Sequence, residues 1–379
     1  MSGVYQIRVK SDAGDLLAIL DDYRTFSFSK IVNEGGSCTI EMHGKGAKVS
    51  LFTLDGQIEI WRRDIAYNID WYLEWEGFIR KFLYEFDDSG DLKFTVNAFT
   101  YNSLLKRRII AYTAGSAQTV KSAPADDVMK SIVRENLGSD ATVLNGRLLG
   151  GVMPGLSVAA DTSEADLFSG QNSYKEVFAI LLEISKANSV DFDIVGVGDG
   201  LFEFRTYYPT RGINLTTDGL SVTTGLNSSG NAPVIFNPLL GNMGSPSYEE
   251  DRSEEKTVVI VAGQGTEENR NIVIAYSPAY TDSLYNQIET NSDSRNSEGN
   301  DDLDSDAAFA LSESQQKQVF NFDPIQTPTA AYGNQYNWGD YVTAQFGNLA
   351  GVNKRVMKVD VSVDNSGNEK ISLELNDYI

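Results

Sequence analysis

The chain contains one histidine and one cysteine, the residue types that carry most nucleophilic, acid–base and metal-binding chemistry near neutral pH. A cysteine–histidine zinc site therefore cannot be built within one chain, and a catalytic triad would have to use His43 itself. His43 ends the segment 37–43, in which apolar and polar residues alternate. This alternation places Cys38 on the buried face of a predicted strand and His43 on its solvent face. We interpret both residues as structural, and we expect no catalytic residue, no cofactor and no metal site.

Two further motifs resemble ligand-binding loops, and for both the structural interpretation is favoured. Residues 196–200, Gly-Val-Gly-Asp-Gly, precede a strand pattern, whereas a nucleotide-binding glycine loop opens a helix, so a turn is predicted. The carboxylates of 301–306 lack the glycine and the distal glutamate of an EF-hand calcium loop. The chain has no G-x-S-x-G, H-E-x-x-H or P-loop sequence. Its 53 Asp and Glu residues leave a glycosidase-type carboxylate pair open, because sequence alone places no pair at the required spacing.

The composition is that of a globular protein rich in short strands. Of 379 residues, 41% are hydrophobic and 22% charged, and 33 glycines accompany 18 tyrosines and 18 phenylalanines. The length predicts about two to three domains. A formal charge of −22 argues against a nucleic-acid-binding surface and against docking on anionic lipid. The first residues read as a charged strand where a signal peptide needs an apolar core, and the longest apolar block, 177–184, is too short to span a membrane.

Strand patterns dominate both ends of the chain. Residues 1–108 form several alternating runs. The longest, 71–86, changes its apolar face at Gly77, which predicts a bulge or a barrel corner. Near the C-terminus, 357–363 and 371–375 alternate on either side of a polar turn, which predicts a hairpin.

The middle of the chain predicts an α+β region, residues 109–232. An apolar stripe predicts a helix over 125–137, and Gly138 is placed to stop it. The capping-box sequence of 173–176 predicts the start of a second helix, and 192–204 reads as a hairpin.

The region that follows returns to strands. Residues 257–261 predict a buried strand, 291–306 an exposed acidic loop, and 304–318 a helix inserted between strands of a second β unit. Gly339-Asp340 predicts a turn that enters a strand over 341–346. The predicted core face of that strand consists of Val342, Ala344 and Phe346.

Short segments spread along nearly the whole chain carry a family resemblance, and their order is its specific part. The segments are Glu74–Lys81, Tyr101–Ile110, Ala125–Lys130 with Val133–Asn136, Gly241–Met243 with Val258–Gly265, and Tyr332–Thr343 with the closing hairpin. In this order they resemble the tail hub proteins of long-tailed bacteriophages, whose fold is shared with the baseplate hub of contractile tails.

The resemblance implies a mainly β fold with α+β insertions. Two small β-barrels, related as in phage baseplate hub proteins, would carry the inserted domains. Residues 1–108 would form the first tube-type β-barrel and 109–232 an α+β inserted domain. Residues 233–270 and 326–379 would form the second tube-type β-barrel, and 271–325 an inserted acidic loop and helix.

The resemblance further implies a non-enzymatic structural hub at the distal end of a bacteriophage tail. A homotrimer would form a ring of six barrels that continues the tail tube and supports host attachment. The implied partners are the distal tail protein, the tape measure protein, and tail fibre or receptor-binding proteins. DNA would pass the channel without stable binding, and this chain would insert in no membrane. Because the chain stops at Ile379, after the second β unit, wall-degrading activity is expected in separate proteins. The implied location is the virion tail tip, after synthesis in the host cytoplasm.

Two alternatives from other functional classes remain open. Aromatic residues such as Tyr336 and Trp338, if exposed, would suit a host-surface carbohydrate or receptor binding module of the tail tip. A carboxylate pair would suit a cell-wall hydrolase. A threefold ring with a central channel favours the hub, a peripheral position favours the binding module, and turnover of peptidoglycan favours the hydrolase.

Overall fold

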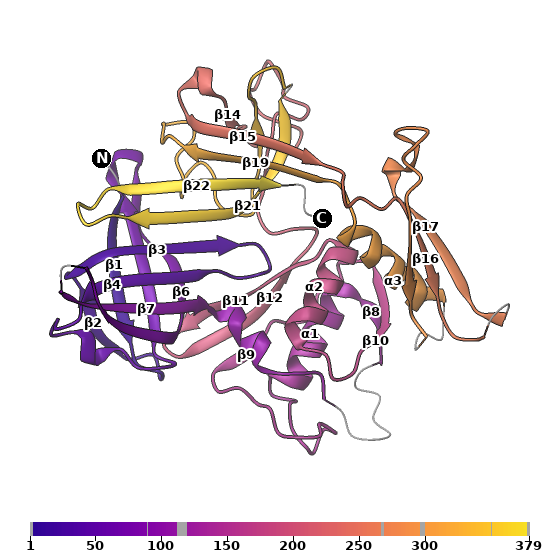
Figure 1. The fold of residues 1–379 in the computed structure, drawn as a ribbon, viewed down its shortest axis with the longest axis horizontal. Coiled ribbons are helices and arrows are strands. Elements are labelled where there is room, and N and C mark those ends of the chain that lie inside the picture. Colours follow the sequence, from indigo (N-terminus) through magenta and orange to yellow (C-terminus); the bar gives the residue numbers. More distant parts are fainter. Residues whose placement is uncertain are drawn as a thin grey trace.

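The computed structural model describes residues 3–88, 90–111, 120–266, 269–295, 300–349 and 351–376. Its strands form one main sheet of fourteen strands and three small sheets (Figure 1). The main sheet is built from both ends of the chain, and the helices lie to one side of it in two inserted regions (Figure 1). The mainly β character with α+β insertions is therefore confirmed.

Seven strands make the N-terminal β unit. Alternating burial on β4, where Cys38, Ile40 and Met42 are fully buried, confirms the predicted inward face of that strand. The strands are β1 (Val4–Lys10), β2 (Leu16–Leu20), β3 (Tyr23–Ile31), β4 (Ser37–His43), β5 (Gln57–Asp64), β6 (Ile69–Phe86) and β7 (Leu92–Thr100).

The C-terminal β unit continues the same sheet. Its strands are β13 (Asn214–Leu215), β14 (Ile235–Phe236), β15 (Met243–Asp251), β19 (Lys317–Pro324), β20 (Tyr341–Ala344), β21 (Val352–Val363) and β22 (Glu369–Asn376). The predicted hairpin is confirmed as β21–β22. The two units join where β21 pairs with β3, with Phe28 opposite Val361 (Figure 1). Their inner faces share one apolar core, which holds Phe28 and Ile40 of the first unit with Val361 and Leu373 of the second.

The expected pair of closed barrels is not confirmed. The strand order is β15-β19-β22-β21-β3-β4-β7-β6-β5-β1-β2, so within the described residues the path has two free ends, β15 and β2. Closure of the N-terminal unit would require β2 to pair with β3. The edges of β3 are already taken by β4 and β21, and β2 is left as an edge.

The central insertion lies between the two β units. It contains β8 (Val120–Pro124), α1 (Ala125–Asn136), β9 (Leu156–Val158), β10 (Leu167–Gln171), α2 (Val177–Asn188), β11 (Asp191–Gly198) and β12 (Leu201–Tyr207). Both predicted helices and the hairpin are confirmed. The predicted capping box is wrong: Glu176 is the N-cap of α2 and makes no side-chain capping bond, because Tyr174 has a φ of +57°, which breaks the local geometry of such a box.

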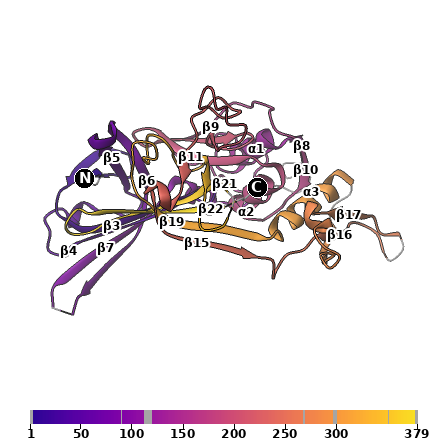
Figure 2. The same ribbon diagram turned by 90° about the horizontal axis from the view of Figure 1, so that it is seen from above.

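The second insertion hangs from β15 and β19, at the end of the molecule far from β1 and β2 (Figures 1 and 2). It contains β16 (Val258–Ala262), β17 (Ile272–Tyr276), β18 (Glu289–Asp293) and α3 (Asn300–Glu313). The predicted strand at 257–261 exists as β16, but it pairs with β17 and β18 instead of joining the second β unit. These pairs bury one sheet face under α3, through Val259, Val261 and Leu303.

The predicted acidic loop over 291–306 is corrected in the same region. Part of it is strand β18, and residues from 300 onward lie in α3, so the predicted helix begins earlier than expected. The reason is that Leu303 and Ala307, one turn apart, are both buried against the small sheet, and this contact extends the helix into the acidic run. Residues 296–299 fall outside the described residues.

Two glycine predictions have different outcomes. At Gly339 φ is +93°, so the predicted turn before β20 is confirmed, and Val342 and Ala344 are buried as expected. Phe346 lies beyond the strand and is 36% exposed, which corrects its assignment to the core face. The bulge predicted at Gly77 lies two residues later, opposite β7, between Ile79 and Lys81.

Candidate functional site

The most reactive side chains in the sequence, those of Cys38 and His43, do not form a site. Cys38 is buried, and burial raises the pKa of its thiol far above the ordinary value. Nδ1 of His43 accepts a hydrogen bond from the Lys45 amide at 3.2 Å. Among the described residues, no three His, Cys, Asp or Glu side chains gather as a metal site would require.

The two segments that resemble ligand-binding loops are parts of secondary structure. The predicted turn is present, but it is shorter: residues 196–198 end strand β11, and Asp199 and Gly200 form the turn to β12. The carboxylates of 302–306 lie on α3, and Asp302 accepts a hydrogen bond from Ser169 of β10 at 2.7 Å. This contact fastens the second insertion to the central insertion.

The two aromatic residues considered for ligand binding are not an exposed pair. Tyr336 is 1% exposed and packs edge-on against Phe236 at 5.1 Å, so its proposed exposure is wrong. Trp338 is half-buried between two cations: its ring lies 3.9 Å from the Arg211 guanidinium carbon and 5.2 Å from Lys30 Nζ. Both rings therefore hold the structure together.

A buried ion pair joins the two β units, and we call it the unit joint. Arg62 of β5 is fully buried, and its Nε lies 2.8 Å from Glu369 Oε1 at the start of β22. The carboxylate also accepts hydrogen bonds from the Tyr5 hydroxyl and, at 3.2 Å, from the Gly3 amide. Arg62 Nη1 donates to the Tyr332 carbonyl oxygen at 3.2 Å.

The unit joint is electrostatically satisfied. Burial alone would raise the pKa of Glu369, but the hydrogen bonds and charge of Arg62 hold that pKa below its ordinary value. The pKa of Arg62 is raised in turn: burial opposes this, and Glu369 outweighs it. Both groups of the pair therefore stay charged at neutral pH, and the ion pair between them is kept.

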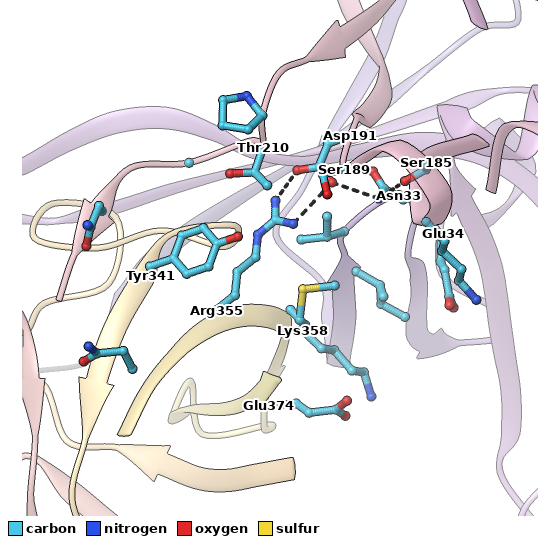
Figure 3. A pocket seen from close by; sticks show the side chains of 18 of the residues that line it. Asn33, Glu34, Ser185, Ser189, Asp191, Thr210, Tyr341, Arg355, Lys358 and Glu374 are labelled. Atoms are coloured by element: carbon cyan, nitrogen blue, oxygen red, sulfur yellow. Dashed lines mark hydrogen bonds and ion pairs between the residues drawn. The ribbon is translucent and has the colours of Figure 1, made fainter. Parts of the chain in front are cut away.

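A second polar contact, which we call the insertion joint, holds the central insertion against the C-terminal β unit. Arg355 of β21 is buried and forms two hydrogen bonds with Asp191 at the start of β11, one of 3.2 Å between Nη1 and Oδ1 (Figure 3). Asp191 also accepts from Asn33 Nδ2 at 2.9 Å, at the end of β3. One carboxylate thus connects three parts of the chain: the N-terminal unit, the insertion and the C-terminal unit.

A cleft of about 750 Å3 opens beside the insertion joint (Figure 3). Asp191 and Arg355 lie at one side of it, and the far side carries Lys358 and Glu374 of the sheet (Figure 3). Apolar side chains of β3, α2 and β21, including Leu182 and Met357, line the space between. The cleft therefore follows the seam between the insertion and the sheet.

The central insertion makes another contact with the sheet near the turn end of the β11–β12 hairpin, through a carboxyl of the N-terminal unit. Glu76 Oε1 of β6 accepts a hydrogen bond from the Gly196 amide at 2.7 Å. Burial raises the pKa of Glu76 to about 7; the Gly196 bond lowers it, whereas Asp193 and Glu59 raise it further. Glu59 lies directly opposite Glu76 across the β5–β6 pair. This carboxyl therefore changes its charge near neutral pH.

A cluster of charges, of which Glu74 is buried and the others are half-buried, lies between these contacts. Asp193 is paired with Arg211 Nη1 at 2.6 Å, but burial still raises the pKa of the carboxyl. Lys30 Nζ lies 3.0 Å from Glu74 Oε1, which also accepts from the Tyr332 hydroxyl at 2.6 Å. These charges lie beside an apolar contact between the insertion and the N-terminal unit, in which Phe78 and Tyr101 pack against Phe202 at 5.3 Å and 4.5 Å.

The outer face of the main sheet is mainly polar on both sides of the β3–β21 pair, although Leu83 and Phe99 of the N-terminal unit are exposed on it. The residues on it alternate in register with the buried core, as Ser27 opposite Ser362 and Ser29 opposite Asp360 show. Its charges are largely paired, with Lys93 Nζ 2.6 Å from Glu41 and Lys370 Nζ 3.1 Å from Asp323. Further members are Ser37, Thr39, Asn97, Asn321, Lys358 and Ser372. We call this surface the polar face.

Sequence reasoning missed both joints, although a signal for them exists. In the sequence, Arg62 continues the parity of the buried residues Ile58 and Ile60 on β5, and Arg355 that of Val359 and Val361 on β21. A charged residue on the apolar parity of a strand needs a partner inside the protein. The identity of that partner, 307 residues away for Arg62, is set only by the fold.

Comparison with known proteins gives one family and several similar structures. A family model described as "Siphovirus ReqiPepy6 Gp37-like protein" matches residues 6–375. No curated protein matches the sequence significantly. The prophage tail protein gp18 of Listeria monocytogenes EGD-e has a TM-score of 0.57 at 11% identity, covering 98% of this chain and 94% of that chain.

Two more structures share the fold. A tail protein from Neisseria meningitidis MC58 has a TM-score of 0.55 at 10% identity, over 100% of this chain and 97% of that chain. A chain of the Francisella PdpA–VgrG complex has a TM-score of 0.57 at 9% identity, over 100% of this chain and 58% of that chain. No helix in the described residues is long and apolar enough to cross a membrane.

Proposed function

The chain belongs to the Siphovirus ReqiPepy6 Gp37-like family of phage tail proteins, and on that premise we propose that it is the structural hub at the distal end of the tail. Three copies would form a ring that continues the tail tube. The proposed neighbours are the distal tail protein, the tape measure protein, and fibre or receptor-binding proteins. The hub would act by shape, without turnover of a substrate, and its place is the tail tip of the virion.

The observation that carries this proposal is the β21–β3 pair. It joins two β units into one wall, with a shared apolar core behind and the polar face in front. With two β units per chain, a trimer would place six β units in a ring. A heterologous contact, repeated by a threefold rotation, closes such a ring. We propose that the two units superpose, and that 1–108 and the C-terminal strands are the tube-type parts.

The polar face suits the wall of a DNA channel. Phosphates bind where lysines and arginines are free to neutralise them. On the polar face, Lys93 and Lys370 are already paired with Glu41 and Asp323. Such a wall would let DNA pass without gripping it. The central and second insertions would lie away from the channel, together with the acidic segment 291–306, because burying unpaired carboxylates in an interface is costly.

The test is the symmetry of this chain in the particle and in solution. Reconstruction of the tail tip should show a homotrimer around a channel continuous with the tail tube. A single copy, or a sixfold ring of this chain, would refute the hub. Incubation with purified peptidoglycan should release no product. Turnover abolished by one Asp or Glu substitution would establish the hydrolase instead.

A further inference from the structure

The longest path through the main sheet ends in two edge strands, β15 and β2, which differ in sequence. In the described part of the chain, β15 pairs only with β19 and β2 only with β1. β15 carries features that protect natural sheet edges: Pro246, a register shift between Gly244 and Ser247, and the acidic run 249–251. These features prevent another strand from pairing with this edge.

The edge strand β2 shares the register shift, which leaves Leu17 without a partner on β1, but it lacks the other two features. Its sequence, Leu-Leu-Ala-Ile-Leu, contains no charge and no proline. Leu16 is 55% exposed, and Leu17 and Ile19 are each 42% exposed. Leu17 lies at the register shift and Ile19 lies opposite Arg8 of β1, and both apolar side chains are exposed at this edge. An exposed apolar edge of this kind is a template for strand addition.

The surroundings of β2 are acidic. Asp12 and Asp15 precede the strand, Asp21 and Asp22 follow it, and all four side chains are exposed. Lys48 partly offsets them: its Nζ pairs with Asp21 and donates to the Ile19 carbonyl oxygen at 2.8 Å. A strand that docks here must therefore bring compensating positive charge at its two ends.

These charges argue against a second copy of this chain as the occupant. An antiparallel β2–β2 pair would place Asp15 of one copy near Asp21 of the other. Pairing with β15 of a neighbour would add its acidic run, 249–251, to the same aspartates. Both contacts oppose like charges, and the second is blocked by Pro246 as well.

We propose that the β2 edge binds an extended segment of a different protein, one with apolar residues at alternate positions and lysine or arginine at both ends. Main-chain hydrogen bonds to edge groups other than the Ile19 carbonyl oxygen, which accepts from Lys48, would align the segment, and its apolar side chains would cover Leu17 and Ile19. Its basic ends would pair with the aspartates on either side. This site is separate from contacts between copies of the hub, so it goes beyond the proposed function.

The experiment uses the full chain and short fluorescent peptides. The first peptide has an alternating valine–threonine centre with two lysines at each end, and the second replaces the lysines by glutamates. A third has the lysines and a central proline. Fluorescence anisotropy should show binding of the first, at least about tenfold weaker binding of the second, and a similar loss for the third.

Matched variants locate the site. Ile19→Lys should lower the affinity for the lysine peptide by about tenfold or more, since it places a charge on the apolar edge. Asp12→Asn with Asp15→Asn should weaken binding and reduce its dependence on salt. Glu249→Gln with Glu250→Gln removes the same charge from the opposite edge and should leave binding unchanged.

Three results would overturn the proposal. The first is equal affinity for the lysine and glutamate peptides, or no binding of either. The second is equal loss in the β15 control, which would indicate a general charge effect. The third is concentration-dependent self-association in sedimentation that Ile19→Lys abolishes, because the occupant would then be a second copy. None of these outcomes depends on the symmetry of the tail tip, so the proposed hub function is tested independently of this binding site.

Discussion

The unit joint connects the two β units of the main sheet, whereas the insertion joint connects the central insertion to that sheet. The two joints are built in different ways. At the unit joint, Arg62 and Glu369 lie within an apolar core that both β units share. The central insertion has its own core, which borrows only a few N-terminal residues such as Phe78 and Leu104. Its contact with the sheet also includes partly buried carboxyls, among them Glu76 and Asp193, whose pKa values are raised above the ordinary range, chiefly by burial. The comparison indicates that the contact of the insertion, unlike the unit joint, contains a carboxyl whose charge changes near neutral pH.

Breaking the unit joint should have the largest effect. Arg62→Met leaves Glu369 buried without its partner, which should lower the free energy of unfolding by about 3–5 kcal/mol in urea titrations. Replacing both residues, as Arg62→Met with Glu369→Leu, removes both buried charges and should recover most of that loss. Equal instability of the single and double variants would contradict the view that the unpaired charge is the cause.

Breaking the insertion joint should come next. Asp191→Asn leaves the buried Arg355 without a carboxylate and should cost about 3 kcal/mol. Hydrogen exchange should rise in β11 and α2 and stay low in β3 and β21, because the β units retain their own core. The control, Asp199→Asn, removes an exposed partner of Lys10 and should change neither property. Faster exchange throughout the sheet would show that the two joints are one cooperative unit.

Glu76→Gln sharpens the comparison through pH. The pKa of Glu76 in the folded protein, about 7, exceeds the ordinary value for glutamate, so folding favours the protonated form. The wild type should lose stability as the pH rises from about 4.5 to 7, by about 3 kcal/mol in total, and change little from this group above that. The variant keeps an oxygen for the Gly196 amide but cannot ionise. It should be nearly equal to the wild type at pH 5 and more stable at pH 8, whereas parallel pH profiles would exclude Glu76 as the cause.

The smallest effect is expected at Gly339, whose carbonyl oxygen accepts from Arg355 Nε at 3.0 Å. Gly339→Val forces a β-branched residue to a φ of +93° and should cost about 1–2 kcal/mol, impairing folding and not one specific activity. Gly150→Ala, where nothing lies within 4 Å of the added carbon, is the matched control. Wild-type thermal stability and assembly of Gly339→Val would count against this requirement for glycine.

The elements were predictable because their signals are local. The parity of 357–363 and 371–375 predicted β21 and β22, and the stripe of 125–137 predicted α1, since each pattern records which face an element buries. The pairing of strands was not predictable to the same degree. Nothing in 257–261 distinguishes a strand of the main sheet from one in a small separate sheet. Likewise, the partner of Arg62 is defined only by long-range contacts.

The β3–β21 pair also has a consequence for the order of synthesis. β3 is complete once residue 31 has been made, but its neighbour β21 begins at residue 352. At ordinary translation rates this leaves one edge of β3 unpaired for about 15–60 s. Throughout that interval the nascent N-terminal unit lacks half of its sheet and exposes core residues such as Phe28. The main sheet can therefore be completed only at the end of translation. Until then the edge of β3 in the growing chain stays unpaired and open to contacts with other strands.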